Sequence, residues 1–149
     1  MKIRKATTND LEPIASMMRI PEFGIMKTAS NTSNKEYLQE FLEKGILIVA
    51  EENTTVIGFI AGEWSLGGII WINLLAVNEH MRGQGIGQQL ISRAIAIARE
   101  KKYYTLYLAA SSPEAVKFYR KFGLDEGEPL TQFSLDLTSK KAQELQKKK

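Results

Sequence analysis

The chain of 149 residues, with 44% hydrophobic and 25% charged side chains, has the size and composition of one globular domain. It contains no cysteine, which excludes disulfides, thiolate nucleophiles and cysteine-rich zinc sites. His80 is the single histidine, and the carboxylates show no metal-ligand spacing, so no metal is expected.

The formal net charge of +3 comes from the C-terminus. Residues 138–149 carry five lysines and one glutamate, which leaves a net charge of −1 for residues 1–137. We therefore expect one domain over residues 1–137 and a lysine-rich, solvated and frayed tail over residues 138–149. A tail that binds nucleic acid is the alternative. Because the composition of the remaining chain reveals no basic face, no nucleic-acid partner is expected.

The sequence shows neither a secretory signal nor a membrane span. Alternating polar and apolar residues follow Met1 directly, and the longest apolar run, Gly67–Val77, is far shorter than the ~20 residues of a membrane-spanning helix. A soluble, cytoplasmic protein without a membrane partner is expected.

The N-terminal third predicts a strand, a helix and an irregular connection. Lys2–Ala6 alternates as a short strand does, and Arg19–Thr32 has no periodicity. Between them, Thr7 and Asp10 have the spacing of a capping box. This spacing predicts the start of a helix whose apolar positions are Leu11, Ile14, Ala15 and Met18.

A second helix and three strands are predicted next. Ser33 and Glu36 repeat the capping-box spacing, and Gly45 stands where a helix ends. Three segments rich in β-branched and aromatic residues then predict antiparallel strands joined by short turns, over Ile46–Ala50, Val56–Trp64 and Ile69–Val77.

The C-terminal half predicts two more helices and two more strands. Helical periodicity begins at Ile86 and reaches Lys101 or Lys102. The remaining predicted elements are a strand over Tyr104–Ala109, a helix over Glu114–Phe122 that ends at Gly123, and an alternating strand over Thr131–Leu137.

A glycine-rich stretch separates the strand over Ile69–Val77 from the long helix. Gly83, Gly85 and Gly87 alternate with other residues directly after Arg82. Such glycines permit a positive φ and remove Cβ atoms, so consecutive N–H groups and the helix N-terminus can bind phosphate oxygens. The spacing fits neither the dinucleotide fingerprint nor the P-loop, which disfavours NAD and ATP as ligands.

The pattern Arg82-x-x-Gly85-x-Gly87 resembles the pyrophosphate-binding motif of the GCN5-related N-acetyltransferase (GNAT) family. Ala115–Leu124 resembles the second signature of that family. The resemblance implies a mixed α/β fold, with a mostly antiparallel central sheet of about six to seven strands and flanking helices. It also implies an acetyl-CoA-dependent N-acetyltransferase, in which a primary amine attacks directly within a ternary complex.

The same resemblance assigns the acetyl-CoA site residue by residue. It places the pantetheine arm along the main chain of Leu75, Ala76 and Val77, between the fourth and fifth strands, and the reaction's oxyanion at an N–H near Leu75 or Ala76. Ser112 stands where the family often has an asparagine that contacts pantetheine. Tyr119 occupies the position of a cosubstrate-contacting tyrosine that acts as general acid for the departing thiolate. The pyrophosphate is expected at Arg82, Gly83, Gln84, Gly85, Ile86, Gly87 and Gln88.

The general base is assigned from the side chains that the sequence offers. Family members with a glutamate base often carry it on the fourth strand, but no acidic residue lies within Ile69–Val77. Glu63 is the nearest substitute, and Asn73 can instead orient a water molecule. The competing interpretation of Glu63 is a solvent-facing strand residue. His80 is interpreted as a surface residue of a turn.

The acceptor pocket is expected between the Arg19–Thr32 connection, the second helix and the strand ends near Glu63. Candidates for its lining are Phe23, Ile25, Tyr37 and Trp71, with Glu22 or Glu36 to attract a cationic amine. The acceptor class stays open among a peptide N-terminus, a protein lysine, a polyamine, an amino acid and an aminoglycoside. Also open are a non-catalytic acyl-CoA-binding or sensing module as the alternative function, and a monomer or homodimer as the assembly.

Overall fold

In the computed structural model, residues 1–18 and 34–148 are described, and they form two compact units that divide between residues 113 and 114. The predicted Arg19–Thr32 connection lies outside the described residues, together with Glu22, Phe23, Ile25 and the predicted cap Ser33.

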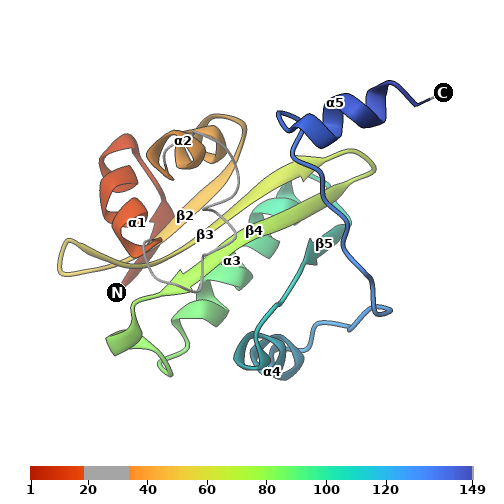
Figure 1. The fold of residues 1–149 in the computed structure, drawn as a ribbon. Coiled ribbons are helices and arrows are strands. Elements are labelled where there is room, and N and C mark those ends of the chain that lie inside the picture. The colour runs from red at the N-terminus through yellow and green to blue at the C-terminus, as the bar shows by residue number, and fades with distance from the viewer. Residues whose placement is uncertain (19–33, 149) are drawn as a thin grey trace. The chain divides into compact units, whose positions relative to one another are not determined.

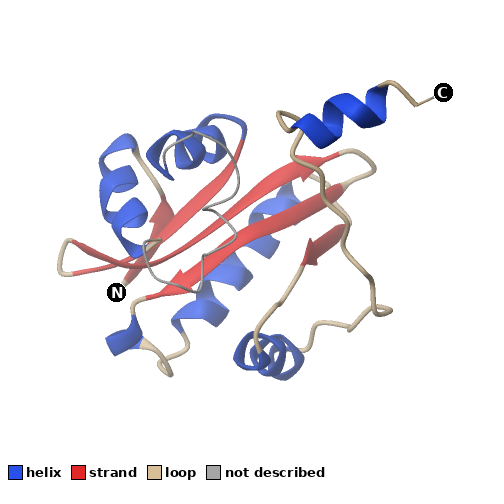
Figure 2. Cartoon of the chain, viewed as in Figure 1, coloured by secondary structure: helices blue, strands red, loops and turns tan. Residues whose placement is uncertain are grey.

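The first unit is built on one sheet, in which the described residues form five strands in the order β1-β2-β3-β4-β5 (Figures 1 and 2). Strands β1 to β4 pair antiparallel, and β5 is parallel to β4. The predicted mixed, mostly antiparallel sheet is confirmed, but the predicted six to seven strands are wrong for the described residues. The strands are β1 (Lys2–Lys5), β2 (Gly45–Glu52), β3 (Thr55–Ser65), β4 (Ile69–Val77) and β5 (Thr105–Leu108).

Helices cover both faces of this sheet. Two of them, α1 (Leu11–Met17) and α2 (Asn34–Lys44), pack on one face, where their apolar side chains share a core cluster with Phe59 of β3. The opposite face belongs to α3 (Ile86–Glu100), because a Cβ built on the neighbouring Gly58 would lie 3.3–3.4 Å from side chains of α3 (Figure 1). The central strands β2 and β3 are therefore buried from both sides, as their apolar runs require.

A β-bulge interrupts the pairing of β3 with β4 at Asn73. Ala61 pairs with Leu74 and Gly62 pairs with Ile72, so Asn73 is the extra residue. As a result, Leu74 shares the α1/α2 face with Trp71, the partner of Glu63, although strict alternation would place them on opposite faces. The bulge thus changes which β4 side chains face α1 and α2.

The second unit contains two helices and a long irregular segment. Helix α4 (Pro113–Phe122), which enters this unit after its first residue, ends before Gly123 as predicted, and residues 124–136 form neither helix nor strand. The predicted strand over Thr131–Leu137 is wrong. Phe133 and Leu137 are 89% and 81% exposed, and no described residue pairs with this segment. Alternation supplies one apolar face, but a strand also needs a partner for its backbone hydrogen bonds.

The lysine-rich tail is not simply frayed. Lys140–Gln146 forms helix α5, and Ser139 caps it by accepting the N–H of Ala142 at 3.1 Å. A serine ahead of good helix formers is the local signal that the prediction of a frayed end overlooked. Most of the tail residues are exposed, in agreement with the predicted solvation.

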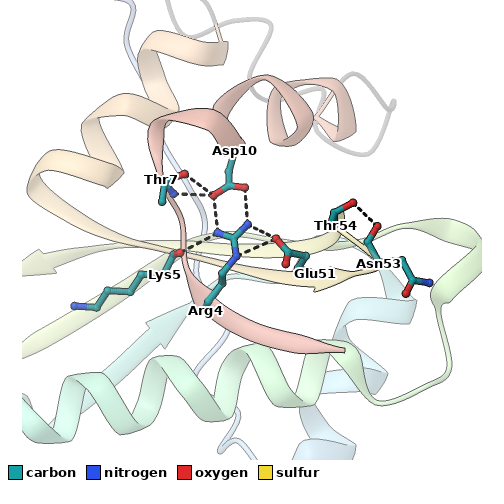
Figure 3. Close-up of polar contacts among 7 residues, drawn as sticks. All are labelled: Arg4, Lys5, Thr7, Asp10, Glu51, Asn53 and Thr54. Atoms are coloured by element: carbon teal, nitrogen blue, oxygen red, sulfur yellow. Dashed lines mark hydrogen bonds and ion pairs between the residues drawn. The ribbon is translucent and has the colours of Figure 1, made fainter.

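One polar network ties the edge of the sheet to the start of α1 (Figure 3). The Arg4 guanidinium donates to both carboxylate oxygens of Asp10, at 2.8 and 2.9 Å, and also binds Glu51. Asp10 also accepts the Thr7 N–H at 2.7 Å, which bears out the predicted capping-box contact. Asp10 is 5% exposed, so the hydrogen bonds from these donors are needed to stabilise its negative charge in the buried position.

Asp10→Asn is expected to lower the free energy of unfolding by about 1–3 kcal/mol at pH 7, because it removes a buried charged acceptor. The hydrogen bonds from Arg4 lower the pKa of Asp10 in the folded state below its ordinary value of 3.8. Its stabilisation is therefore complete above that value and is lost as the pH falls through the folded-state pKa. Urea unfolding from pH 7 to pH 2 measures this. The difference in unfolding free energy between Asp10→Asn and wild type should shrink in acid, whereas the exposed control Asp125→Asn should differ little from wild type at any pH. A difference for Asp10→Asn that does not change with pH would contradict the assignment.

Candidate functional site

Strand β4 has one open edge along its second half. It pairs with β3 over its whole length, but with β5 only from Ile69 to Ile72. From Asn73 to Val77 its edge away from β3 therefore has no strand partner among the described residues. Backbone N–H and C=O groups along such an edge can pair with an extended ligand as they would with another strand. This edge contains Leu75, Ala76 and Val77, for which that pairing is predicted.

A short loop connects this edge to α3. The Asn78 N–H donates to Ile57 O at 2.8 Å, which holds the loop at the end of β3. His80 lies exposed in the 3-10 turn η3 (Glu79–Met81), where it was predicted to be a surface turn residue. The Arg82 side chain donates from Nε to Val77 O at 3.3 Å, so it folds back toward the end of β4.

The loop turns into the helix through glycines in the left-handed region. Gly83 and Gly85 have φ values of 80° and 78°, and a Cβ built on either would meet nothing within 4 Å. The space beside the loop is therefore open to a ligand. The expectation of a positive φ is wrong for Gly87. This residue lies inside α3, which has already begun at Ile86, and it is not among the residues with positive φ.

The N–H groups of the loop and helix start form a surface that can donate hydrogen bonds to an anion. The first helical hydrogen bond of α3 runs from the Gln89 N–H to Gly85 O at 3.1 Å, so the N–H groups of Ile86, Gly87 and Gln88 have no carbonyl partner one helical turn back. The Arg82 N–H already donates to Glu79 O at 3.3 Å, which moves the start of this surface to Gly83. The helix dipole adds positive potential there, which suits a pyrophosphate.

Three polar side chains meet on the α1/α2 face beside the bulge. The Asn73 amide donates to Glu63 Oε2 at 3.5 Å and also forms a hydrogen bond with the Tyr37 hydroxyl. Burial raises the pKa of Tyr37, the charge of Glu63 raises it further, and the bond from Asn73 opposes both. The structure thus brings together Glu63, Asn73 and Tyr37, which the sequence predicted separately. Their meeting depends on the bulge, which the sequence did not indicate.

Two aromatic rings continue this face toward β5. Trp71 and Tyr107 stack with ring centroids 5.2 Å apart and an interplanar angle of 28°. Register places Glu63, Trp71 and Tyr107 in one row across β3, β4 and β5. Trp71 was a predicted lining residue, whereas Tyr107 was missed because its strand partner was unknown. Glu36 lies exposed in the first turn of α2.

Ser112 and Tyr119 lie in different units. Ser112 directly precedes α4, and Pro113 opens that helix, as its fixed φ favours. Tyr119 lies within α4, where its ring makes an edge contact with Phe118 at 5.2 Å and its carbonyl accepts the Leu124 N–H at 3.1 Å. Burial raises the pKa of the Tyr119 hydroxyl, which therefore keeps its proton at neutral pH.

Two findings concern other site types. In the part of the chain that the structure describes, no group of three His, Asp or Glu side chains is placed to hold a metal ion. Within residues 1–18 and 34–148, no helix combines the length and apolar character that crossing a membrane requires.

Comparison with known proteins decides the family. Residues 15–124, well over half of the chain, match the model of the acetyltransferase (GNAT) family. The chain belongs to this family. The open β4 edge, the glycine loop and the start of α3 all lie within the matched region of this GNAT chain.

One curated relative of this GNAT chain is an acetyltransferase by name. Acetyltransferase Atu2258 of Agrobacterium fabrum is 30% identical over 77 residues, which cover 52% of this chain and 56% of that protein. The chain thus spans a little over half the length of the curated relative it matches.

Among solved structures, an aminoglycoside acetyltransferase from an uncultured soil metagenomic sample, in complex with trehalose, has a TM-score of 0.72 and 23% identity. That match covers 92% of this chain and 96% of the other. AAC(6')-Iy, in complex with the bisubstrate analogue CoA-S-monomethyl-acetylneamine, has a TM-score of 0.73 and 16% identity, over 91% of this chain and 97% of the other. At these sequence identities, the two comparisons show a similar fold and nothing further.

Proposed function

We propose that the protein is an N-acetyltransferase that moves the acetyl group of acetyl-CoA to a primary amine by direct attack in a ternary complex. One observation carries this proposal: the open edge of β4, Asn73 to Val77, leads within a few residues into a glycine loop and the N-terminus of α3. A ligand with an extended, amide-bearing arm that ends in a pyrophosphate fits this succession of backbone hydrogen-bonding groups. Acetyl-CoA has that chemistry, and AAC(6')-Iy, of like fold, is named with a CoA-containing analogue.

The binding roles follow from the geometry of each segment. Leu75, Ala76 and Val77 would pair through their main chain with the pantetheine amides. Residues Gly83 to Gln88 would donate N–H groups to the pyrophosphate, and Gly83 and Gly85 leave room for it because no Cβ projects there. Arg82 would add a charged contact at the rim, and Ser112 a hydroxyl contact to pantetheine.

The transfer itself needs a neutral amine, a stabilised oxyanion and a proton for the thiolate. An alkylamine with a pKa near ~10.4 reaches the site mostly protonated at neutral pH. Glu63, held by Asn73, would act as the base, and an N–H at Leu75 or Ala76 would stabilise the oxyanion. Because Trp71, the cross-strand partner of Glu63, lies four residues before Leu75, a chain of water molecules would carry the proton from the amine to Glu63. Tyr119 would protonate the departing thiolate.

Release of free thiol from acetyl-CoA tests the proposal. Purified protein should release thiol when supplied with one class of primary amine from a panel of polyamines, amino acids, aminoglycosides and short peptides, and the product should carry an acetylated nitrogen. No release above the acceptor-free rate with any class would overturn the proposal. The same result with intact acetyl-CoA binding would favour a non-catalytic acyl-CoA-binding module, for which the absence of a carboxylate on β4 is the supporting observation.

A further inference from the structure

An aromatic and acidic row crosses the sheet where β4 loses β5 as its partner. Glu63, Trp71 and Tyr107 are cross-strand neighbours on one face. Cβ atoms of an antiparallel pair such as Glu63 and Trp71 lie about 4.5–5.5 Å apart, and the rings of Trp71 and Tyr107 are 5.2 Å apart between centroids. Trp71 is 40% exposed and Tyr107 is 48% exposed. Two large rings therefore keep much of their surface accessible beside a carboxylate.

The chemistry of this row suits a cation. Tyr107 stacks against Trp71 from the β5 side, and Glu63 flanks Trp71 from the β3 side. The indole face attracts a cation through its quadrupole, and a carboxylate adds a charge-assisted contact. The Asn73 amide, which donates to Glu63 Oε2, helps to hold that carboxylate in place. A neutral apolar ligand would make no charge-assisted contact with the Glu63 carboxylate.

The position of the row separates it from the reacting centre. Trp71 lies four residues before Leu75, but Asn73 is the bulged residue, so their partners Glu63 and Ile60 are three residues apart on β3. At ~3.3 Å per residue the two positions are about 10 Å apart. The reacting amine must lie near Leu75 and Ala76 if the acetyl group is held there, and this step rests on the proposed function. One small monoamine is too short to reach both places.

We propose that the Glu63–Trp71–Tyr107 face is a subsite for a second cationic group of the acceptor. The acceptor class is then an amine that carries another ammonium group roughly 10 Å from the nitrogen that is acetylated. The subsite orients such a dication along β4, with one end on the Trp71 ring and the other at the open edge of the strand. With such an acceptor bound, Glu63 is the counter-ion of the second ammonium group, and water oriented by Asn73 takes the proton of the attacking amine in its place.

Binding of a cation that cannot be acetylated tests the subsite without turnover. Trp64 and Trp71 are the two tryptophans of the chain, so a Trp64→Phe background isolates Trp71 fluorescence. Tetramethylammonium should change this fluorescence saturably, and Glu63→Gln, which removes one exposed charge pair, should weaken its binding by roughly 2- to 5-fold. Equal effects of tetramethylammonium and the neutral, similarly shaped neopentyl alcohol would overturn the subsite. If Trp64→Phe does not fold, the Trp71 indole resonance in the wild-type NMR spectrum gives the same readout.

Kinetics with acceptors of graded length give the second test. In a series of linear diamines with about four to about ten methylenes, KM should fall as the ammonium groups approach the predicted spacing, while matching monoamines show no such trend. Trp71→Leu should raise KM for the long diamines and leave KM for acetyl-CoA unchanged. The matched control is Trp64→Leu, which alters the other tryptophan, next to Lys101 and Tyr103.

The two tests separate the subsite from the reaction. Tetramethylammonium binding that depends on Glu63, without thiol release for any amine, would overturn acetyl transfer and retain the cation site. Thiol release without any preference for long diamines, together with unchanged KM values in Trp71→Leu, would overturn the subsite alone.

Discussion

Gly85→Glu is expected to weaken acetyl-CoA binding by at least about 100-fold, measured as Kd by isothermal titration calorimetry. Gly85 has a φ of 78° and faces open space, so the new side chain would project from the loop where the pyrophosphate is proposed to bind. Its carboxylate would face phosphate oxygens, and placing like charges next to each other costs several kcal/mol of binding free energy. Each 1.4 kcal/mol lowers the affinity about tenfold. Unchanged affinity would contradict the site.

Two controls separate this charge effect from backbone strain. Gly85→Ala adds a Cβ to the same left-handed residue and costs about 1–2 kcal/mol of conformational energy without a charge. Gly67→Glu introduces a glutamate at a nearly identical φ of 77°, in the β3–β4 turn, where the nearest atom to a new Cβ is 4.0 Å away. Gly67→Glu should lower stability but leave the Kd for acetyl-CoA near the wild-type value. An equal loss of affinity in both glutamate variants would indicate general unfolding.

The parts of the fold that the sequence predicted are those with strong local signals. The capping pair Thr7 and Asp10, the helix stop at Gly45 and the apolar spacing of Ile86 to Ala98 each depend on residues a few positions apart. The three β strands of the central hairpins were also predicted, because β-branched runs and short turns mark them. In each case the physical cause lies within about one turn or one hairpin of the residue concerned.

Features that depend on distant partners were not predictable. The bulge at Asn73 arises from how β3 and β4 pair, and it decides that Asn73 meets Glu63 and Tyr37. The stack of Trp71 on Tyr107 needs the parallel register of β4 and β5. The strand predicted over Thr131–Leu137 does not form, because this alternating segment has no strand to pair with among the described residues. The glycine loop was predicted because the positive φ values of Gly83 and Gly85 require glycine locally. Gly87 was grouped with them by its spacing, although it lies inside the helix that the periodicity already predicted from Ile86.

Tyr119→Phe is expected to lower kcat by about 100- to 10,000-fold, the range of a general acid, while the Kd for acetyl-CoA changes little. Burial raises the pKa of Tyr119 above its ordinary value near 10, so the phenol is protonated at pH 7 and can donate. Its contribution should therefore be complete at neutral pH and decline as the pH rises through that raised pKa. Tyr104→Phe, which removes a hydroxyl from a residue that is 84% exposed, is the matched control.

A change of leaving group distinguishes a general acid from a packing residue. A thiol with an ordinary pKa near ~8.5 leaves as a thiolate that benefits from a proton as the carbon–sulfur bond breaks. An acetyl thioester of a more acidic thiol needs that proton less, so the defect of Tyr119→Phe should shrink with such a substrate. If Tyr119 only packs against its neighbours, the defect would be the same for both thioesters, because the hydroxyl would then have no part in bond cleavage. Unchanged kcat in Tyr119→Phe would remove Tyr119 from the reaction altogether and leave Glu63, Asn73 and the β4 main chain to account for the transfer.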